Sequence, residues 1–267
     1  MRAPDTELEA RADLARAISA VRQAGEVALR RFGRRVKNWR KADGTPVSEA
    51  DLEVDAVLRR SLTGRGAPYG WHSEESQAGS PLQQRFWLVD PIDGTSAFLG
   101  GNDAWCISLA LVDNHRPILG LIYAPAQQRL YSAASGHGAM VNDEPLRVSE
   151  RKALAGARLI ANVSALKAQR WHDPLPDTQR ASVPSLALRL AHVAQGEAEA
   201  ALAFSYKHDW DLAAGDLIVN EAGGKMSDLD GQGLRYDFAR TRRLGFICAN
   251  AFIHAALLAH GPIAAGQ

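Results

Sequence analysis

A short run of large apolar residues that ends in two acidic residues constrains the fold of this chain more than any other feature. Phe86-Trp87-Leu88-Val89 contains no polar residue, which is typical of a strand buried on both faces of a sheet. Asp90 and Asp93 follow, on either side of Pro91-Ile92. Because proline disrupts a regular strand, we expect the chain to turn there and to bring the two carboxylates together. The sequence therefore predicts a buried sheet with an acidic site at the end of one strand.

The residues around this strand predict helices followed by hairpins. Apolar residues at helical spacing predict a first helix from Leu14 to Phe32, ended by Gly33, and a second helix that Ser48 caps and that runs through Leu62. The polar segment 38–46 between them is expected to be a mobile loop. Apolar runs separated by polar turns predict an antiparallel meander with strands at 106–112, 117–123 and 129–133.

The second half of the chain has a different pattern. It predicts a strand, a helix and a strand at 158–163, 185–194 and 198–204, followed by a helix, a strand and a helix at 211–222, 244–249 and 252–259. We therefore expect an α+β fold with a boundary near residue 145. The interpretation is an N-terminal α+β domain over 1–145, with a mobile loop and a metal-binding motif, and a C-terminal α/β domain over 146–267.

Charge and cysteine content exclude several classes of function. The 267 residues include 31 Lys plus Arg and 30 Asp plus Glu, so no excess of positive charge indicates binding to a nucleic-acid polymer. Cys106 and Cys248 lie in apolar runs, where reduced, buried thiols are expected. The N-terminus is charged and no apolar run approaches the roughly 20 residues of a membrane span. We expect a cytoplasmic protein that acts on a small molecule and has no membrane partner.

The acidic residues suit the hydrolysis of a phosphate monoester. Bringing water against a phosphate dianion requires concentrated positive charge, which two or more Mg²⁺ ions supply. Mg²⁺ prefers carboxylate and carbonyl oxygens, and Asp90, Asp93 and the Ile92 carbonyl offer them close together. Gly94 permits close backbone approach, so that exposed amides could bind phosphate, and the Thr95 hydroxyl could orient the attacking water.

Each of these residues also has a structural interpretation. An Asp-x-x-Asp-Gly segment also occurs in plain turns and in calcium loops. Asp51 lies three positions after Ser48 and could complete a capping arrangement at a helix N-terminus, and both roles could coexist. Asp211 could cap the helix that it begins.

Two separated motifs resemble those of one family. Asp90-Pro91-Ile92-Asp93-Gly94-Thr95 and the segment from Trp210-Asp211 through Gly223-Gly224 are similar to the signatures of the lithium-sensitive, Mg²⁺-dependent phosphatases. This family includes inositol monophosphatase and 3′(2′),5′-bisphosphate nucleotidase, and the likeness spans nearly the whole chain. It implies a metal-dependent phosphoric monoester hydrolase with a layered α-β-α-β-α sandwich fold.

The resemblance also implies which residues bind two or three Mg²⁺ ions. Glu74, Asp90 and the Ile92 carbonyl would hold one ion, Asp90, Asp93 and Asp211 a second, and Glu74 with water a third. The expected catalytic residues are Asp51, Thr95 and Glu74, with Asp51 and Thr95 acting as a pair on the attacking water. The residues expected to contact the phosphate or the substrate are Gly94, Thr95, Asp93 and Asp211.

The sequence predicts the substrate and the binding partners less specifically than it predicts the metal site. Thr95-Ser96-Ala97-Phe98 departs from the Thr-Thr-Asn-Phe that is usual in inositol monophosphatases, and residues 117–125 and 130–134 look closer to bacterial nucleotidases. We therefore expect adenosine 3′,5′-bisphosphate as the lead substrate, with inositol 1-phosphate and histidinol phosphate as alternatives. A regulatory protein that acts by protein contact is the alternative outside enzymes, and the resemblance suggests a homodimer.

Three further residues have two interpretations each. Glu75 is either a solvated loop acid or a supporting catalytic residue. His208 is either a structural histidine or a residue that contacts substrate. Arg189 is either on a solvated helix face or in contact with substrate.

Overall fold

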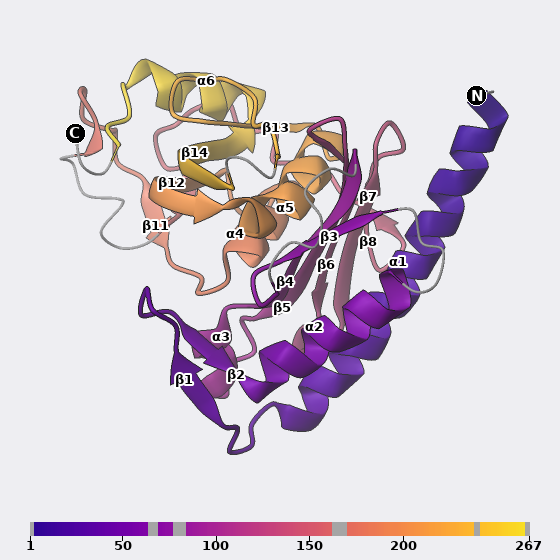
Figure 1. Cartoon of the computed structure of the whole chain (residues 1–267). Coiled ribbons are helices and arrows are strands. Elements are labelled where there is room, and N and C mark those ends of the chain that lie inside the picture. The colour runs from indigo at the N-terminus through magenta and orange to yellow at the C-terminus, as the bar shows by residue number, and fades with distance from the viewer. Residues whose placement is uncertain (1–2, 64–68, 77–83, 162–169, 238–240, 265–267) are drawn as a thin grey trace.

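The protein is built of five alternating layers of helices and sheets. The computed structural model describes residues 3–63, 69–76, 84–161, 170–237 and 241–264. A pair of helices, a seven-stranded sheet, a second pair of helices, a five-stranded sheet and a single helix follow one another through the molecule (Figure 1). The predicted α+β class and the layered α-β-α-β-α arrangement are confirmed.

The seven-stranded sheet contains the predicted meander. Its strands lie in chain order, and all neighbours are antiparallel except the first pair, which is parallel. The strands are β3 (Gly70–Ser73), β4 (Arg85–Asp93), β5 (Cys106–Asp113), β6 (Arg116–Ala124), β7 (Arg129–Ala134), β8 (Ala139–Val141) and β9 (Glu144–Pro145). A short 3₁₀ helix, Pro125–Gln127, joins β6 to β7.

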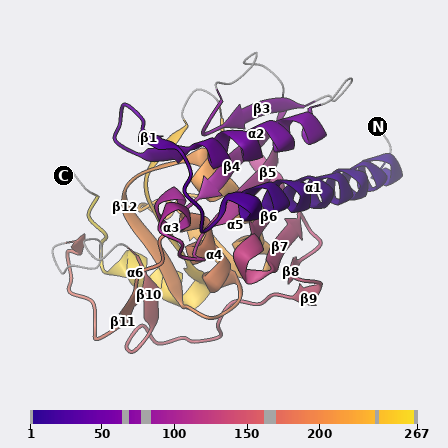
Figure 2. The same ribbon diagram turned by 90° about the horizontal axis from the view of Figure 1, so that it is seen from below.

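Two long helices cover one face of this sheet. α1 (Ala3–Arg31) and α2 (Glu49–Leu62) lie side by side, and their apolar faces pack on β4, β5 and β6 (Figure 2). The prediction that Gly33 follows the end of the first helix is confirmed, because Gly33 has a φ of 69°. The N-terminal end of α1 projects beyond the sheet (Figures 1 and 2).

The five-stranded sheet belongs to the second half of the chain. Its order is β11-β10-β12-β14-β13, parallel on the β11 side and antiparallel on the β13 side. The strands are β10 (Arg158–Ile160), β11 (Gln179–Ala181), β12 (Ala200–His208), β13 (Gly224–Ser227) and β14 (Arg242–Asn250). α6 (Ala251–Ala259) packs on the outer face. The last part of the predicted strand 158–163 lies outside the described residues.

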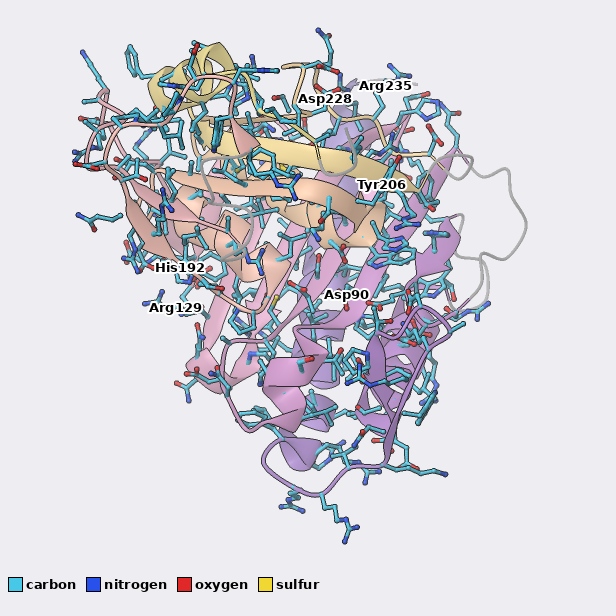
Figure 3. All side chains as sticks on the ribbon, turned by 90° about the vertical axis from the view of Figure 1, so that its left-hand side faces the viewer. Asp90, Arg129, His192, Tyr206, Asp228 and Arg235 are labelled. Atoms are coloured by element: carbon cyan, nitrogen blue, oxygen red, sulfur yellow. The ribbon has the colours of Figure 1, made fainter. Side chains whose placement is uncertain are left out.

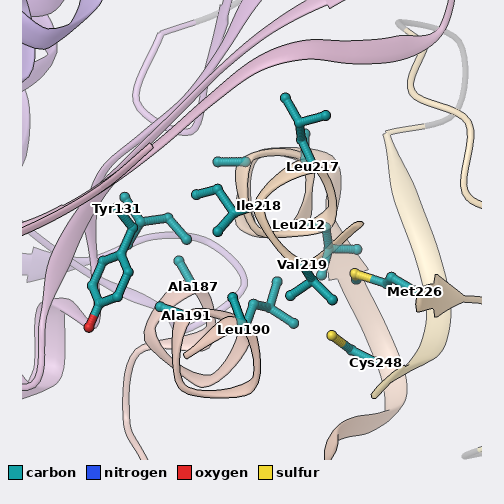
Figure 4. Packing of buried hydrophobic residues seen from close by; sticks show 14 of the residues in the cluster. Tyr131, Ala187, Leu190, Ala191, Leu212, Leu217, Ile218, Val219, Met226 and Cys248 are labelled. Atoms are coloured by element: carbon teal, nitrogen blue, oxygen red, sulfur yellow. The ribbon is translucent and has the colours of Figure 1, made fainter. Parts of the chain in front are cut away.

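The middle layer joins the two sheets. α4 (Leu186–Ala194) and α5 (Asp209–Glu221) bury their side chains against β5, β6 and β7 on one side and β12, β13 and β14 on the other. Figure 4 shows Leu190 and Val219 of these helices between Tyr131 of the first sheet and Cys248 of the second. The boundary that we infer near residue 145 falls between the sheets, and this shared core crosses it, so the division at 145 stays a prediction.

The α5 backbone lies very close to the first sheet at one glycine. A Cβ atom added to Gly120 of β6 would lie 2.7 Å from the Ala214 carbonyl oxygen. Real Cβ atoms do not approach a backbone oxygen so closely, so only glycine allows this packing distance. Gly120 therefore allows the short distance between the backbones of α5 and β6.

Several local predictions are corrected. β4 does not end at Asp90 but continues to Asp93, with a shift of register against β5 that accommodates Pro91. Segment 38–46 is not simply a loop, because β1 (Asn38–Arg40) and β2 (Pro46–Ser48) pair as a hairpin. A short helix, α3 (Thr95–Leu99), follows β4. Among the described residues, none of the helices combines the length and hydropathy needed to cross a bilayer.

Candidate active site

Three separate segments bring four acidic side chains to the junction of the layers. Glu74 follows β3, and its amide donates to the Val89 carbonyl at 3.1 Å, which holds the residue beside β4. Asp90 and Asp93 lie at the end of β4, and Asp211 lies in the first turn of α5. In Figure 3, Asp90 lies between the N-terminal and the C-terminal halves of the molecule.

Three of these carboxylates form a compact cluster. Glu74, Asp90 and Asp211 each offer an oxygen atom that lies within 4.8 Å of the oxygens offered by the other two. Burial raises the pKa of Asp90 well above its usual value, and the negative charges of Glu74 and Asp93 raise it further. Burial and the charge of Asp93 likewise raise the pKa of Asp211. Positive charge at these oxygens would therefore favour the ionised forms of Asp90 and Asp211.

Asp93 lies beside this cluster but is not part of it. Its Oδ2 atom accepts hydrogen bonds from the Ser185 hydroxyl at 2.6 Å and from the Ala187 amide at 2.5 Å, both at the start of α4. Burial raises the pKa of Asp93, whereas these hydrogen bonds oppose the rise. One oxygen of Asp93 is thus committed to α4, which fixes the direction of the carboxylate.

Asp51 makes the contacts expected for both of its proposed roles, helix capping and pairing with Thr95. Its Oδ2 atom accepts hydrogen bonds from the amide of Ser48 at 2.8 Å and from the Ser48 hydroxyl at 2.6 Å, which completes a capping box on α2. Its Oδ1 atom lies 3.1 Å from the hydroxyl oxygen of Thr95. Burial raises the pKa of Asp51 above its ordinary value. One carboxylate therefore caps a helix and contacts Thr95 at the same time.

The chain turns sharply between Ile92 and Thr95. The Thr95 hydroxyl also lies 3.1 Å from the Ile92 carbonyl oxygen, so its single proton is shared between this acceptor and Asp51. Gly94 has a φ of 96°, and a Cβ atom there would lie 3.0 Å from the Ala104 carbonyl oxygen. Glycine is therefore required, and it places the start of α3 next to the acids.

A lysine from the β1–β2 hairpin contacts the acidic site. The Lys41 ammonium lies 2.8 Å from Glu74 and 2.7 Å from Glu75. Burial lowers the pKa of Lys41, but the two carboxylates outweigh that effect and the net change is a rise. Burial raises the pKa of Glu75 to about 7. With a side chain only 6% exposed, Glu75 is not the solvated loop acid that was one of its two interpretations.

The structure shows the surroundings of Arg189 and His208, which the sequence left open. Arg189 is 5% exposed and donates to the carbonyls of Val183 and Pro184, so the solvated helix face is wrong. Burial lowers its pKa, although the charges of Asp93 and Asp211 favour the charged form. The His208 ring stacks on Trp210 with ring centroids 4.3 Å apart.

Two residues near the acids were missed in the sequence. Ser185 caps α4 by accepting from the Leu188 amide while it donates to Asp93. A serine before an apolar helix was a visible capping signal, but its partner on β4 was not visible. Lys207 lies near the end of β12, and nothing in its sequence position indicated that it lies near Asp93 and Asp211.

The donor set fits Mg²⁺ better than a softer metal. The clustered groups are carboxylates, with the Ile92 carbonyl close to Thr95, and no histidine or cysteine belongs to the cluster among the described residues. Hard oxygen donors of this kind suit Mg²⁺, and the raised pKa values of Asp90 and Asp211 are what cations at these oxygens would relieve. Glu74, Asp90 and Asp211 are the residues that would hold them, with Asp93 beside them.

Fold and site together define a class: a five-layer α+β protein with a carboxylate cluster, suited to divalent cations, where the layers meet. The model of the inositol monophosphatase family matches residues 10–262. The chain therefore belongs to the inositol monophosphatase family, and it is a phosphatase of that family.

Curated relatives with different names match most of the chain. Nus factor SuhB of Xylella fastidiosa is 35% identical over 227 residues, which cover 80% of this chain and 81% of the relative. Histidinol-phosphatase of Mycobacterium tuberculosis is 35% identical over 231 residues, 82% of this chain and 88% of the relative. The 3′(2′),5′-bisphosphate nucleotidase CysQ of Shigella flexneri is 33% identical over 202 residues, 73% of this chain and 81% of the relative.

Solved structures share the fold along nearly the whole chain. The suhB protein of Bartonella henselae has a TM-score of 0.81 at 28% identity and covers 93% of this chain and 98% of its own. An inositol monophosphatase of Thermotoga maritima has a TM-score of 0.77 at 28% identity and covers 91% and 93%. The expected family and the expected phosphatase class are therefore confirmed.

Proposed function

We propose that this phosphatase uses Mg²⁺ to hydrolyse a small phosphate monoester, with adenosine 3′,5′-bisphosphate as the lead substrate. The observation that carries the proposal is the convergence of Glu74, Asp90 and Asp211 to within 4.8 Å of one another, next to the contact between Asp51 and Thr95. A cluster of carboxylates in which burial raises the pKa of two members, Asp90 and Asp211, is characteristic of a functional site rather than of a structural core.

The residues of the site have complementary roles in this proposal. Mg²⁺, when bound, supplies positive charge for the phosphate oxygens and lowers the pKa of a bound water. Thr95 orients the attacking water through its hydroxyl, and Asp51, whose pKa burial raises, accepts the proton that the water loses. The water oxygen bonds to phosphorus, the ester P–O bond breaks, and the released alcohol takes up a proton.

The amides at the start of α3 complete the proposed site. Gly94 and Thr95 begin this helix, where backbone N–H groups point away from the helix and are available to a phosphate oxygen. Asp93 and Asp211 are proposed to lie at the substrate as well as at the metal. Asp93 is already oriented for this by its hydrogen bonds to α4.

The choice of substrate is supported by sequence detail. Ser96 and Ala97 depart from the usual inositol monophosphatase residues, and a relative that is 33% identical is named a 3′(2′),5′-bisphosphate nucleotidase. The other relatives and solved structures keep inositol 1-phosphate and histidinol phosphate as alternatives.

A substrate panel with metal control tests the proposal. Purified protein is assayed with adenosine 3′,5′-bisphosphate, inositol 1-phosphate and histidinol phosphate, first with Mg²⁺, then after chelation, then with Mg²⁺ restored. We expect turnover that is lost and regained with the metal, and the highest kcat/KM for the bisphosphate. A clear preference for inositol 1-phosphate would overturn the choice of substrate, and turnover that survives chelation would overturn the metal.

Asp90→Asn tests the cluster itself. The substitution keeps the shape of the side chain but removes a charged ligand, so we expect kcat to fall by about 10³-fold or more and the stabilisation of the fold by Mg²⁺ to shrink. Turnover and the melting temperature with and without Mg²⁺ are the measurements. Asp143→Asn is the matched control, because Asp143 is exposed in a turn that contains none of the proposed site residues. This variant is expected to behave as the wild type. Normal turnover by a folded Asp90→Asn protein would contradict the proposed site.

A role in protein contact is the second candidate, because a relative that is 35% identical is named a Nus factor. Intact acidic residues at each proposed position favour catalysis over a purely regulatory role. Absence of turnover on the whole panel, by a folded protein with Mg²⁺, would favour the regulatory alternative. The homodimer suggested by the resemblance stays a prediction.

A further inference from the structure

One irregular strand reaches the candidate active site from the second sheet. The register between β12 and β14 shifts between Ala203 and Tyr206, so β12 contains one more residue than the strand it pairs with. Gly245 of β14 has a φ of 75°, and a Cβ atom there would lie 2.6 Å from the Ala203 carbonyl oxygen. Such bulges redirect side chains and are frequent beside active sites. Here the bulge ends the buried part of β12.

The residues after the bulge are no longer part of a core. Ala200 to Phe204 are buried, whereas Ser205 and Tyr206 are exposed and Lys207 is half-buried. Asp211 follows only four positions later, at the start of α5. The bulge therefore lies between the buried part of β12 and the short segment, including Lys207, that leads to Asp211.

Lys207 is surrounded by charge but is not paired with it. Its ammonium lies near enough to Asp211, Asp93 and Arg189 for their charges to affect its pKa, which burial lowers. Its Nζ atom lies 3.3 Å from the Ser205 hydroxyl oxygen, a neutral partner at long hydrogen-bond distance. Among the residues that the structure describes, no carboxylate forms an ion pair with Lys207.

Two other cations near the acidic residues, Lys41 and Arg189, already have partners. Lys41 forms ion pairs with both Glu74 and Glu75. Arg189 donates to two backbone carbonyls, which fix its guanidinium against α4. A half-buried ammonium loses part of its hydration, and a neutral hydroxyl compensates that loss poorly. Lys207 is thus the cation that an incoming anion would stabilise most.

We propose that Lys207 determines specificity by binding a second anionic group of the substrate, a phosphate or carboxylate other than the phosphate that is hydrolysed. The inference rests on the proposed function and deepens it, because it names the substrate class as phosphate monoesters with a second negative charge. A nucleoside 3′,5′-bisphosphate has this property, whereas inositol 1-phosphate and a nucleoside 3′-monophosphate do not.

The alternative role for Lys207 is to balance the charge of Asp211. A residue that only balances charge would affect every substrate equally, because it would act on the metal site that all of them share. A residue that binds the second anion would affect only substrates that carry one. The ratio between two matched ligands separates these roles.

The test uses hydrolysis of p-nitrophenyl phosphate by the whole protein with Mg²⁺, inhibited by adenosine 3′,5′-bisphosphate or by adenosine 3′-monophosphate. These two nucleotides differ only in the 5′-phosphate. For Lys207→Gln we expect the inhibition constant of the bisphosphate to rise by about 10- to 100-fold, and that of the monophosphate to change by less than about threefold. Lys207→Arg should recover part of the affinity. Lys225→Gln, at an exposed lysine of β13, is the matched control and should change neither constant.

The outcomes are distinct. An equal rise for both nucleotides, or no rise for either, overturns the role of Lys207 while the phosphatase activity stands. A wild-type protein that hydrolyses p-nitrophenyl phosphate but binds both nucleotides equally also overturns it. A wild-type protein without turnover of any monoester overturns the proposed function and, with it, the inference that rests on it.

Discussion

Asp216 is a buried acid that lies outside the acidic cluster. It is 4% exposed in the middle of α5, where it accepts a hydrogen bond from the Tyr236 hydroxyl at 2.8 Å and one from the Asn220 amide at 2.7 Å. Burial raises the pKa of Asp216 to about 6, although the two hydrogen bonds by themselves lower this pKa. An ionised Asp216 therefore costs the folded protein free energy at neutral pH.

Asp216→Asn should change how stability depends on pH. The pKa of Asp216 is raised in the folded state, so its stabilising contribution is complete below about pH 4 and is lost as the pH rises through about 6. We expect the free energy of unfolding of the wild type, relative to the variant, to fall by about 3 kcal/mol across this window, as an order of magnitude. Denaturant unfolding from pH 4 to pH 7 measures it.

The quantity to compare is the difference in free energy of unfolding between the wild type and Asp216→Asn at each pH. Burial lowers the pKa of His254 to about 4, which gives the wild type an opposite slope in the same window. His254 is unchanged in the variant, so its effect cancels. Parallel pH profiles for the two proteins would show that Asp216 does not titrate as described.

Individual residues also mark the limits of what the sequence could predict. The acids of the two motifs, Asp90 and Asp211, could be expected to meet only because both motifs resemble those of one family, since no local pattern links two residues so far apart in the sequence. The position of Arg189 could not, because an arginine on a helix is usually solvated and only the packing of α4 between two sheets buries it. The position of Lys207 could not be predicted either, because it follows a bulge in β12 that the sequence does not reveal.

At the scale of elements, long periodic segments were predicted well and short ones were not. The cap of α2 at Ser48 and the meander β5, β6 and β7 follow from local patterns and were found where predicted. The strands β3, β8, β9, β11 and β13 contain two to four residues each, too few for an alternating pattern to emerge. Their pairing partners, rather than their own residues, make them strands.

The start of α4 connects an element to the site. Ser185→Ala removes the cap of the helix and one hydrogen bond to Asp93, so we expect a loss of about 1–3 kcal/mol in the free energy of unfolding. We also expect kcat/KM to fall by about tenfold, because the Asp93 carboxylate loses part of its orientation. Denaturant unfolding and Mg²⁺-dependent turnover are the two measurements.

Asn250→Ala is the matched control for this prediction. Asn250 is the last residue of β14 and caps α6, the helix on the outer face of the second sheet, by accepting from the Ile253 amide. Its removal should destabilise the fold to a similar extent while leaving the turnover of the folded protein unchanged. An equal loss of turnover in both variants would mean that Ser185 acts only through stability.

The whole molecule depends on how closely its layers pack. Helices α4 and α5 are shared by both sheets, so the site residues on β4 and α5 are positioned by a core that neither half of the chain forms alone. The order of the layers followed from the resemblance to the family, whereas composition and periodicity indicated only an α+β chain. Local patterns carry no information on which face of a sheet each helix covers.

Gly120→Ala should separate two layers. The added methyl group would lie 2.7 Å from the Ala214 carbonyl oxygen, so α5 has to move away from β6, and we expect a loss of about 1–3 kcal/mol together with reduced turnover as Asp211 moves. Gly233→Ala is the control, because a Cβ atom there has only the flexible Arg116 guanidinium, at 3.4 Å, as a neighbour. Melting temperature and turnover of both variants decide the matter, and equal stability of the two would contradict the role of Gly120.

The ion pairs of Lys41 with Glu74 and Glu75 connect the β1–β2 hairpin to the candidate metal site. A cation held by Glu74 would compete with the Lys41 ammonium for this carboxylate, so occupancy of the metal site and the position of the hairpin would be linked.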